Sequence, residues 1–147
     1  RPRATAAGVI RTDPASQRPR RLAELQGELR SLIAELRPDV VAVERVLFQR
    51  NVATAMAVGQ ASGLVMAEAA SAGCVVVEYS PNEVKEAVAG WGGADKEEVG
   101  AMVQILLGLP ERLKPHDAAD AVAVALCHLA RVPARAVRRP ARTAVTR

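Results

Sequence analysis

The chain has 147 residues, half of them apolar, and carries a formal net charge of +4 at pH 7. A chain of this length predicts one domain with its own hydrophobic core, and the apolar content excludes disorder of the whole. We expect neither an apolar run of the roughly 20 residues that span a membrane nor a signal peptide, and no membrane partner. The two cysteines have no partner at metal-like spacing, which predicts a reducing, cytoplasmic setting.

The first part of the chain predicts two strands with a helix between them. Residues 8–12 form a short candidate strand that ends at an Asp-Pro break. Residues 17–36 predict an amphipathic helix, because leucines recur at alternating spacings of three and four: Leu22, Leu25, Leu29, Leu32 and Leu36. Residues 40–44 are continuously apolar up to Glu44, which is typical of a buried parallel strand.

The middle of the chain predicts a loop, a helix of small residues and another buried strand. The loop covers residues 46–50. Alanine and glycine dominate from about residue 51 to 72, so that another backbone can approach closely. This helix is therefore predicted either to be tightly buried or to lie at a subunit interface. Gly73 suits the position just after its end, and residues 74–78 predict the strand.

The last part of the chain predicts three helices. Ser80-Pro81-Asn82-Glu83 is a capping box with proline at the first helical position, so a helix begins there. Asp95 is predicted to cap a second helix that runs to about Leu107, and a third begins near Asp117. The Cys127-His128 pair late in that helix is interpreted as core packing. The order β-α-β-α-β-α-α-α predicts an α/β fold in which helices cover a sheet.

A basic segment closes the sequence. Residues 131–147 alternate arginine with alanine, valine and proline. We expect them to form a disordered tail after a domain of residues 1–130. The positive field of such a tail favours phosphate backbones at low salt, and the simpler alternative is a solubilising terminus.

Three acids stand where a divalent cation could be held. Glu44 ends its strand, and sites of open α/β sheets gather at the carboxyl ends of strands. Asp117 and Asp120 are three residues apart, so they share a helix face near its positive end. Hard cations such as Mg²⁺ prefer carboxylates, and two such ions can assist phosphodiester cleavage. The spacing leaves open a second interpretation: a solvated strand end, a helix cap and a first-turn acid.

A series of short motifs follows one order along residues 8–130: Val43-Glu44-Arg45-Val46, Asn51, Gly59-Gln60-Ala61-Ser62-Gly63, Tyr79-Ser80-Pro81-Asn82-Glu83-Val84-Lys85, Gly93-Ala94-Asp95-Lys96 and His116-Asp117-Ala118-Ala119-Asp120-Ala121. In this order and spacing they resemble the RuvC family of bacterial Holliday-junction resolvases. The resemblance implies an RNase H-like mixed sheet with flanking helices. It also implies a homodimer that cuts two symmetric strands of a four-way DNA junction with two Mg²⁺ ions per site, Mn²⁺ being an expected substitute. A branch-migration helicase complex is the partner implied by analogy.

The resemblance also implies roles for individual residues. Glu44, Asp117 and Asp120 match three of the family's four catalytic, metal-binding carboxylates. Lys85 and Lys96 match lysines near the scissile DNA, and Lys96 is expected to act in catalysis; either alone would be interpreted as a surface lysine. Further DNA contacts are expected from the loop that enters the junction and from the helix after it, with one of the first two residues as the wedge: Leu47, Phe48, Arg50, Asn51, Gln60 and Ser62.

One catalytic acid of the family has no counterpart in the sequence. The family carries it in a Gly-Ile-Asp-Pro-Gly motif on its first strand, upstream of the segment that residues 8–12 match. Asp13-Pro14 is only superficially similar, because Asp13 lies 31 residues before Glu44 (44 minus 13), which is too close. We therefore expect the first strands to be missing and residues 1–147 alone to cut little or nothing. The alternatives are a junction-binding dimer without catalysis and another RNase H-like nuclease, such as one that processes ribosomal RNA.

Overall fold

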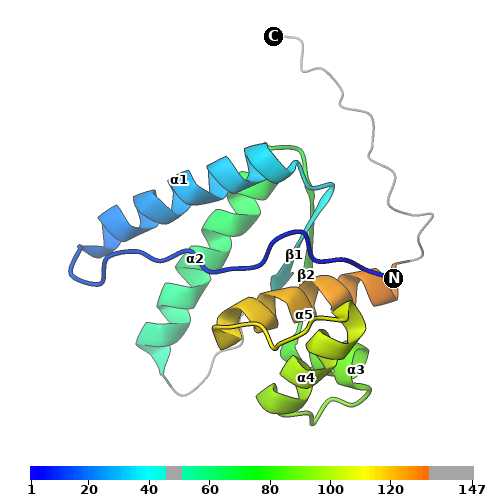
Figure 1. Ribbon diagram of the computed structural model, residues 1–147. Helices are drawn as coiled ribbons and strands as arrows, with labels where there is room; N and C mark the ends of the chain where they lie inside the picture. The colour runs from blue at the N-terminus through cyan, green and yellow to red at the C-terminus, as the bar shows by residue number, and fades with distance from the viewer. Residues whose placement is uncertain (46–50, 133–147) are drawn as a thin grey trace.

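Five helices and two strands make up the described part of the chain (Figure 1). The computed structural model describes residues 1–45 and 51–132. The elements in chain order are α1 (Arg18–Leu36), β1 (Val40–Glu44), α2 (Val52–Ser71), β2 (Val75–Tyr79), α3 (Pro81–Ala89), α4 (Lys96–Leu107) and α5 (His116–Arg131). All seven correspond to elements that the sequence predicts, with ends that differ by one or two residues.

Two capping boxes begin α3 and α4, as the sequence predicts for α3 and as Asp95 predicts for α4. The Ser80 hydroxyl accepts a hydrogen bond from the Glu83 N–H at 3.2 Å, and the Glu83 carboxylate accepts one from the Ser80 N–H at 2.7 Å. Asp95 and Glu98 exchange the same two bonds, each at 2.8 Å. These boxes satisfy N–H groups that have no partner within the helix, so they fix where α3 and α4 begin.

The strands β1 and β2 are parallel and in register, with Val40 opposite Val75 and Glu44 opposite Tyr79. The Arg45 N–H extends this ladder by donating to the Tyr79 carbonyl at 2.7 Å. Because the strands are parallel, both end at the same edge of the sheet, and Glu44 emerges there as the sequence predicts. The α/β class is confirmed.

The predicted strand at residues 8–12 is wrong. This segment has no regular secondary structure, and within residues 1–45 and 51–132 the strand β1 pairs with β2 alone. An apolar segment becomes a strand only where a neighbour accepts and donates its backbone hydrogen bonds. The chain then turns at Asp13, whose carboxylate accepts hydrogen bonds from the Ala15 N–H at 2.9 Å and the Ser16 hydroxyl at 3.2 Å. Asp13 therefore serves a local turn.

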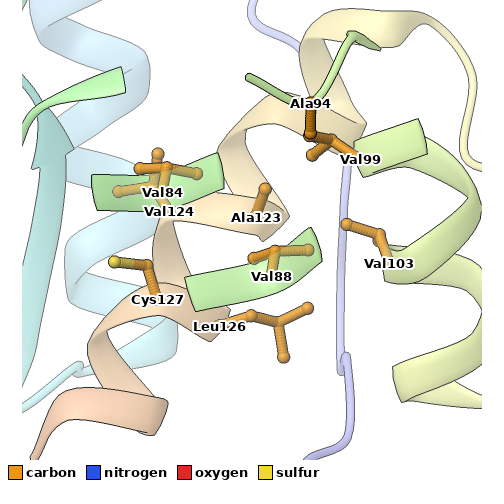
Figure 2. Close-up of a cluster of buried hydrophobic side chains, with 9 residues drawn as sticks. All are labelled: Val84, Val88, Ala94, Val99, Val103, Ala123, Val124, Leu126 and Cys127. Carbon is orange, nitrogen blue, oxygen red and sulfur yellow. The ribbon is translucent and has the colours of Figure 1, made fainter. Parts of the chain in front are cut away.

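The buried core lies among α3, α4 and α5 (Figure 2). Figure 1 shows these three helices clustered together, apart from the pair in which α1 packs along α2. Valine and alanine dominate the core, and such short side chains allow helix axes to approach closely. Its members are Val84, Val88, Ala94, Val99, Val103, Ala123, Val124, Leu126 and Cys127. This cluster holds α5, and with it the two aspartates of its first turns, against α3 and α4.

Helix α2 differs from two expectations. By length and composition it could cross a membrane, so the expectation that no segment reaches such a span is wrong. Many alanines raise the average apolarity of this helix without a run of bulky side chains. Length and composition alone are weak evidence that a helix spans a membrane. Nor is α2 tightly buried within this one chain: Val52, Met56 and Val58 are 64%, 52% and 49% exposed.

Glu68 of α2 holds α1 in place. Its side chain is buried, and its carboxylate accepts hydrogen bonds from Gln26 at 2.5 Å and Arg30 at 2.7 Å. The bond from Arg30, followed by that from Gln26, holds the pKa of Glu68 below its ordinary value of 4.5. The two helices are thus joined by a carboxylate that must stay ionised.

We predict that this carboxylate makes the protein acid-sensitive. A folded pKa below the unfolded pKa gives stability that is present above about pH 4.5 and is lost as pH falls through the lower, folded value. Urea midpoints measured between pH 3 and 7 should therefore fall more steeply on the acid side for the parent protein than for Glu68→Gln. Parallel curves for the two proteins would contradict this role of Glu68.

Candidate active site

The acids and lysines singled out in the sequence come from four elements. Glu44 is the last residue of β1 and is exposed as a whole residue. Asp117 and Asp120 lie in the first two turns of α5, where Asp117 is exposed and Asp120 half-buried. Lys85 is half-buried on α3, and Lys96 is the exposed first residue of α4. The carboxyl edge of the sheet thus meets the starts of two helices.

The start of α5 decides between two interpretations of Asp117. The residue that caps this helix is Pro115, and no side chain there accepts a capping hydrogen bond. Asp117 lies inside the first turn, so its interpretation as the helix cap is wrong. The first-turn position still favours its negative charge, because the N–H groups and dipole of a helix start are positive. Asp117 therefore remains available to an external ligand.

Asp120 and Lys96 form an ion pair across α5 and α4. The Lys96 ammonium lies 3.3 Å from Asp120 Oδ2, and the two side chains are 73% and 40% exposed. An ion pair this exposed contributes little to stability, because water screens it and the long lysine side chain loses freedom. Its importance is positional, since it brings a positive charge to the acid at the edge of the sheet.

Glu44 belongs to the same electrostatic cluster. Partial burial of its carboxyl raises its pKa above the ordinary value, and the negative charge of Asp120 raises that pKa further. The positive charges of Lys96 and Lys85 act in the opposite direction on the same pKa. Glu44, Asp120, Lys96 and Lys85, named here the edge cluster, therefore interact although they come from four separate elements.

The donor chemistry of this cluster suits a hard divalent cation. Its acids offer only oxygen ligands, and the repulsion by which Asp120 raises the pKa of Glu44 is relieved when a cation binds between the two carboxylates. The geometry is less complete. Among the residues that the structure describes, no three His, Cys, Asp or Glu side chains are grouped closely enough to hold a metal ion. Asp120 is the acid that acts on the pKa of Glu44, whereas Asp117 is not among the groups that affect it.

The predicted DNA contacts fall partly outside the described residues. Leu47, Phe48 and Arg50 lie in the segment 46–50, which the structure does not describe. Asn51 caps α2, since its side-chain oxygen accepts a hydrogen bond from the Thr54 N–H at 3.2 Å. Asn51 is exposed, so its amide nitrogen is still accessible.

The two polar residues further along α2 are less accessible. Gln60 and Ser62 are both half-buried. The side-chain oxygen of Gln60 is buried and has no hydrogen-bond partner in the described part of the chain. This oxygen cannot meet DNA in the present arrangement, so any contact by Gln60 uses its amide nitrogen.

The expected boundary of the basic tail also shifts. Arg131 is the last residue of α5 and forms an ion pair with Glu83 of α3 at 3.1 Å, so it belongs to the domain. A helix continues as long as its side chains find partners on the neighbouring elements, and composition alone does not indicate where that ends. Residues 133–147 lie outside the described residues.

Sequence reasoning found the members of the edge cluster but missed the contacts behind it. Tyr79 lies opposite Glu44 in the sheet, and its hydroxyl lies 2.9 Å from Nδ1 of His128 on α5. The interpretation of Cys127-His128 as core packing is confirmed, since these residues are 0% and 8% exposed. The partner of His128 lies 49 residues away, so no local pattern in the sequence indicates it.

Comparison with known proteins gives consistent matches over nearly the whole chain. The family model described as crossover junction endodeoxyribonuclease RuvC matches residues 2–128. The crossover junction endodeoxyribonuclease RuvC of Moorella thermoacetica is 52% identical over 134 residues, which cover 90% of this chain and 80% of that protein. The protein of the same name from Salinispora arenicola is 53% identical over 121 residues, 82% of this chain and 69% of that one.

Two solved structures are also similar. The structure of Thermus thermophilus RuvC matches with a TM-score of 0.79 at 39% identity, covering 87% of this chain and 77% of that one. T. thermophilus RuvC in complex with a Holliday junction substrate matches with a TM-score of 0.81 at 39% identity, covering 86% of this chain and 77% of that one. The fold of this chain thus has the same counterpart in both structures.

Proposed function

This chain belongs to the RuvC family of crossover junction endodeoxyribonucleases, and from that premise we propose that its edge cluster is part of an active site that resolves four-way DNA junctions. The reaction is the hydrolysis of a phosphodiester bond in each of two symmetric strands. The observation that carries this proposal is the interaction of Glu44 with Asp120 and two lysines at the carboxyl edge of the sheet.

The family is metal-dependent, and we propose Mg²⁺ as the ion, with Mn²⁺ as its substitute. Glu44, Asp117 and Asp120 are the residues that would hold two ions, because they supply carboxylate oxygens at one edge of the sheet. Bound there, the metal would supply a polarised water and a counter-charge for the leaving oxygen. Because the described residues hold no group of three such ligands, we propose that DNA or metal binding completes the grouping of these acids.

The lysines have a separate role in this proposal. Lys96 is exposed and loosely paired with Asp120, so it can turn to a phosphate oxygen on which negative charge develops. Lys85 lies close enough to Glu44 to affect the pKa of that acid, and it extends the positive field toward the DNA backbone. Both lysines thus balance acids in the free protein and phosphates in the complex.

The remaining contacts to the junction are proposed by family resemblance. The segment 46–50, which carries Leu47, Phe48 and Arg50, comes two residues after Glu44 in the sequence. Asn51 begins the next helix with an accessible amide nitrogen. Gln60 and Ser62 lie further along the same helix. We propose that this stretch enters the junction and positions it over the acids.

We also propose that the protein acts as a homodimer in the cytoplasm. Symmetric cuts need two sites, and α2 leaves apolar side chains uncovered that a second copy would bury: Val52, Met56 and Val58. The small residues of α2 permit close approach of another backbone. A branch-migration helicase complex is proposed as a further partner by family analogy alone.

The test is a synthetic four-way junction incubated with Mg²⁺, with a linear duplex of the same sequence as control. Two proteins are compared: residues 1–147, and the same chain preceded by a first strand with the Gly-Ile-Asp-Pro-Gly motif, named here the extended chain. We expect both to bind the junction in preference to the duplex, and only the extended chain to cut two opposing strands symmetrically. Sedimentation of the extended chain should report a dimer.

Two results would contradict the proposal. If neither protein cuts but both bind the junction, the acids are structural and the protein is a DNA-binding module. If duplex and junction are bound equally well, the protein has no structural specificity, and another RNase H-like nuclease activity becomes the better interpretation.

A further inference from the structure

Tyr79 is joined to both elements that carry the acids. Its backbone carbonyl accepts a hydrogen bond from the Arg45 N–H at 2.7 Å, which fixes the peptide directly after Glu44. Its side-chain hydroxyl is hydrogen-bonded to Nδ1 of His128 at 2.9 Å, which fixes the last turn of α5. One residue therefore connects the strand of Glu44 with the helix of Asp120.

The surroundings hold Tyr79 and His128 in this arrangement. The Arg131 guanidinium lies 5.7 Å from the centre of the Tyr79 ring and forms an ion pair with Glu83 at 3.1 Å. The Cys127 thiol lies 3.5 Å from the Glu83 carbonyl, within reach of a weak hydrogen bond. Contacts among β2, α3 and α5 thus enclose the pair on several sides.

His128 depends on Tyr79 for its orientation. Its side chain is buried, and within the described residues its Nε2 has no hydrogen-bond partner. A buried polar group without a partner is costly, so the single bond at Nδ1 is expensive to break. Since no second hydrogen bond holds the imidazole ring in this part of the chain, its position follows that of the Tyr79 hydroxyl.

We propose that Tyr79 and His128 form a positioning pair that sets the distance between the carboxylates of Glu44 and Asp120. The proposal rests on the metal-binding role proposed for these acids. Asp120 and His128 are eight residues apart on one helix, about 12 Å at 1.5 Å per residue. A helix is stiff over two turns, so fixing His128 against β2 fixes the height of Asp120 beside Glu44.

The ion pair at the start of α5 is a weaker restraint. Lys96 binds Asp120 through an exposed ion pair on a flexible side chain, which restrains the helix little. The part-buried bond between Tyr79 and His128, near the other end of α5, is anchored to a hydrogen-bonded strand. The core cluster holds α5 against α3 and α4, and this bond adds the polar restraint against sliding of α5 along the sheet, a movement that would separate the acids without unfolding either element.

The test measures metal binding by residues 1–147 without DNA. Mg²⁺ is titrated while the amide resonances of residues 117–120 are followed by NMR. Tyr79→Phe keeps the ring and removes the hydroxyl, and we expect it to weaken Mg²⁺ binding about tenfold, the size of effect known for groups that orient metal ligands. His128→Leu is expected to do the same. His128→Asn places an amide where Nδ1 stands and is expected to restore binding close to that of the parent protein.

Controls separate positioning from a general loss of stability. Glu68→Gln removes the charge of a buried carboxylate that pairs with Arg30 between α1 and α2, and it should lower the melting temperature without changing Mg²⁺ affinity. If Glu68→Gln weakens Mg²⁺ binding as much as Tyr79→Phe does, or if His128→Leu and His128→Asn bind alike, the positioning role is overturned.

A reference variant identifies which proposal has failed. Asp120→Asn should weaken Mg²⁺ binding more than either pair variant does. If Asp120→Asn weakens binding and Tyr79→Phe does not, only the positioning role is overturned and the active-site proposal stands. If Asp120→Asn has no effect, the metal site itself is wrong, and the pair has no acids to position.

Discussion

Asp120→Asn in the extended chain should abolish junction cleavage and leave junction binding nearly intact. The substitution keeps the shape of the side chain and removes the charge that a divalent cation needs. The loss should exceed the roughly 10–100-fold that removal of an outer-shell partner costs, because Asp120 is proposed as a ligand itself. Single-turnover cleavage and a gel-shift titration on the same junction measure the two effects. Glu44→Gln should likewise abolish cleavage and keep binding.

A matched control tests whether any buried or turn-forming aspartate would give this result. Asp13→Asn makes the same chemical change in an acid whose carboxylate serves a local turn, and cleavage should be unchanged.

A third measurement on Asp120→Asn needs no DNA. The charge of Asp120 raises the pKa of Glu44, so Asp120→Asn should lower that pKa in a carbon-detected NMR titration. Full cleavage by Asp120→Asn would rule out the assignment.

Lys96→Met should change two measurements in opposite directions. Without DNA, the Lys96 ammonium occupies Asp120 at 3.3 Å and competes with a metal ion for that carboxylate. Its removal should tighten Mg²⁺ binding roughly fivefold. Two unit charges about 4 Å apart interact by about 1 kcal/mol in water, which corresponds to about a fivefold change in affinity. Cleavage by the extended chain should nevertheless fall about 100-fold, because a donor to the developing phosphate charge is lost.

The opposite signs distinguish this role from a general electrostatic one. Arg20→Met removes one positive charge from the exposed surface of α1, where Arg20 forms an ion pair with Glu24 of the same helix. Neither Mg²⁺ affinity nor the cleavage rate should change in that control.

A Lys96→Met variant that weakened both metal binding and cleavage would contradict this role. Lys96 would then support the acids rather than compete with a metal ion for Asp120, and its proposed role at the phosphate would have no basis.

Local signals in the sequence predicted most of the elements. The leucine spacing predicted α1, the capping box predicted the start of α3, and Asp95 predicted that of α4. Each signal depends on residues within one or two turns, so no distant partner decides it. The strand ending in Glu44 was predicted for the same reason, since a run of β-branched side chains is informative by itself.

Predictions that needed a distant partner were less successful. Residues 8–12 have the composition of a strand, but composition does not supply a neighbour to pair with. The small residues of α2 did not decide between a buried helix and a subunit interface. Either one requires a partner surface elsewhere, and the local sequence does not show that surface. Asp117 was placed correctly on α5, yet its distance from Glu44 depends on how the helix packs. The Tyr79–His128 bond joins residues 49 apart and could not be predicted from spacing.

The distribution of the core has a consequence for how the site comes apart. Every residue of the core cluster lies between positions 84 and 127, whereas α1 has no buried residue. Contacts that are close in sequence form early and open last, so amide exchange should be slowest in α3 to α5 and faster in α1 and α2. Ala42 and Tyr79 pack against the core cluster, so the strand of Glu44 belongs with the helix of Asp120 to the half that persists. A brief local opening would therefore displace the predicted DNA contacts on α2 while the two acids stay together, and junction binding would be lost before the fold is.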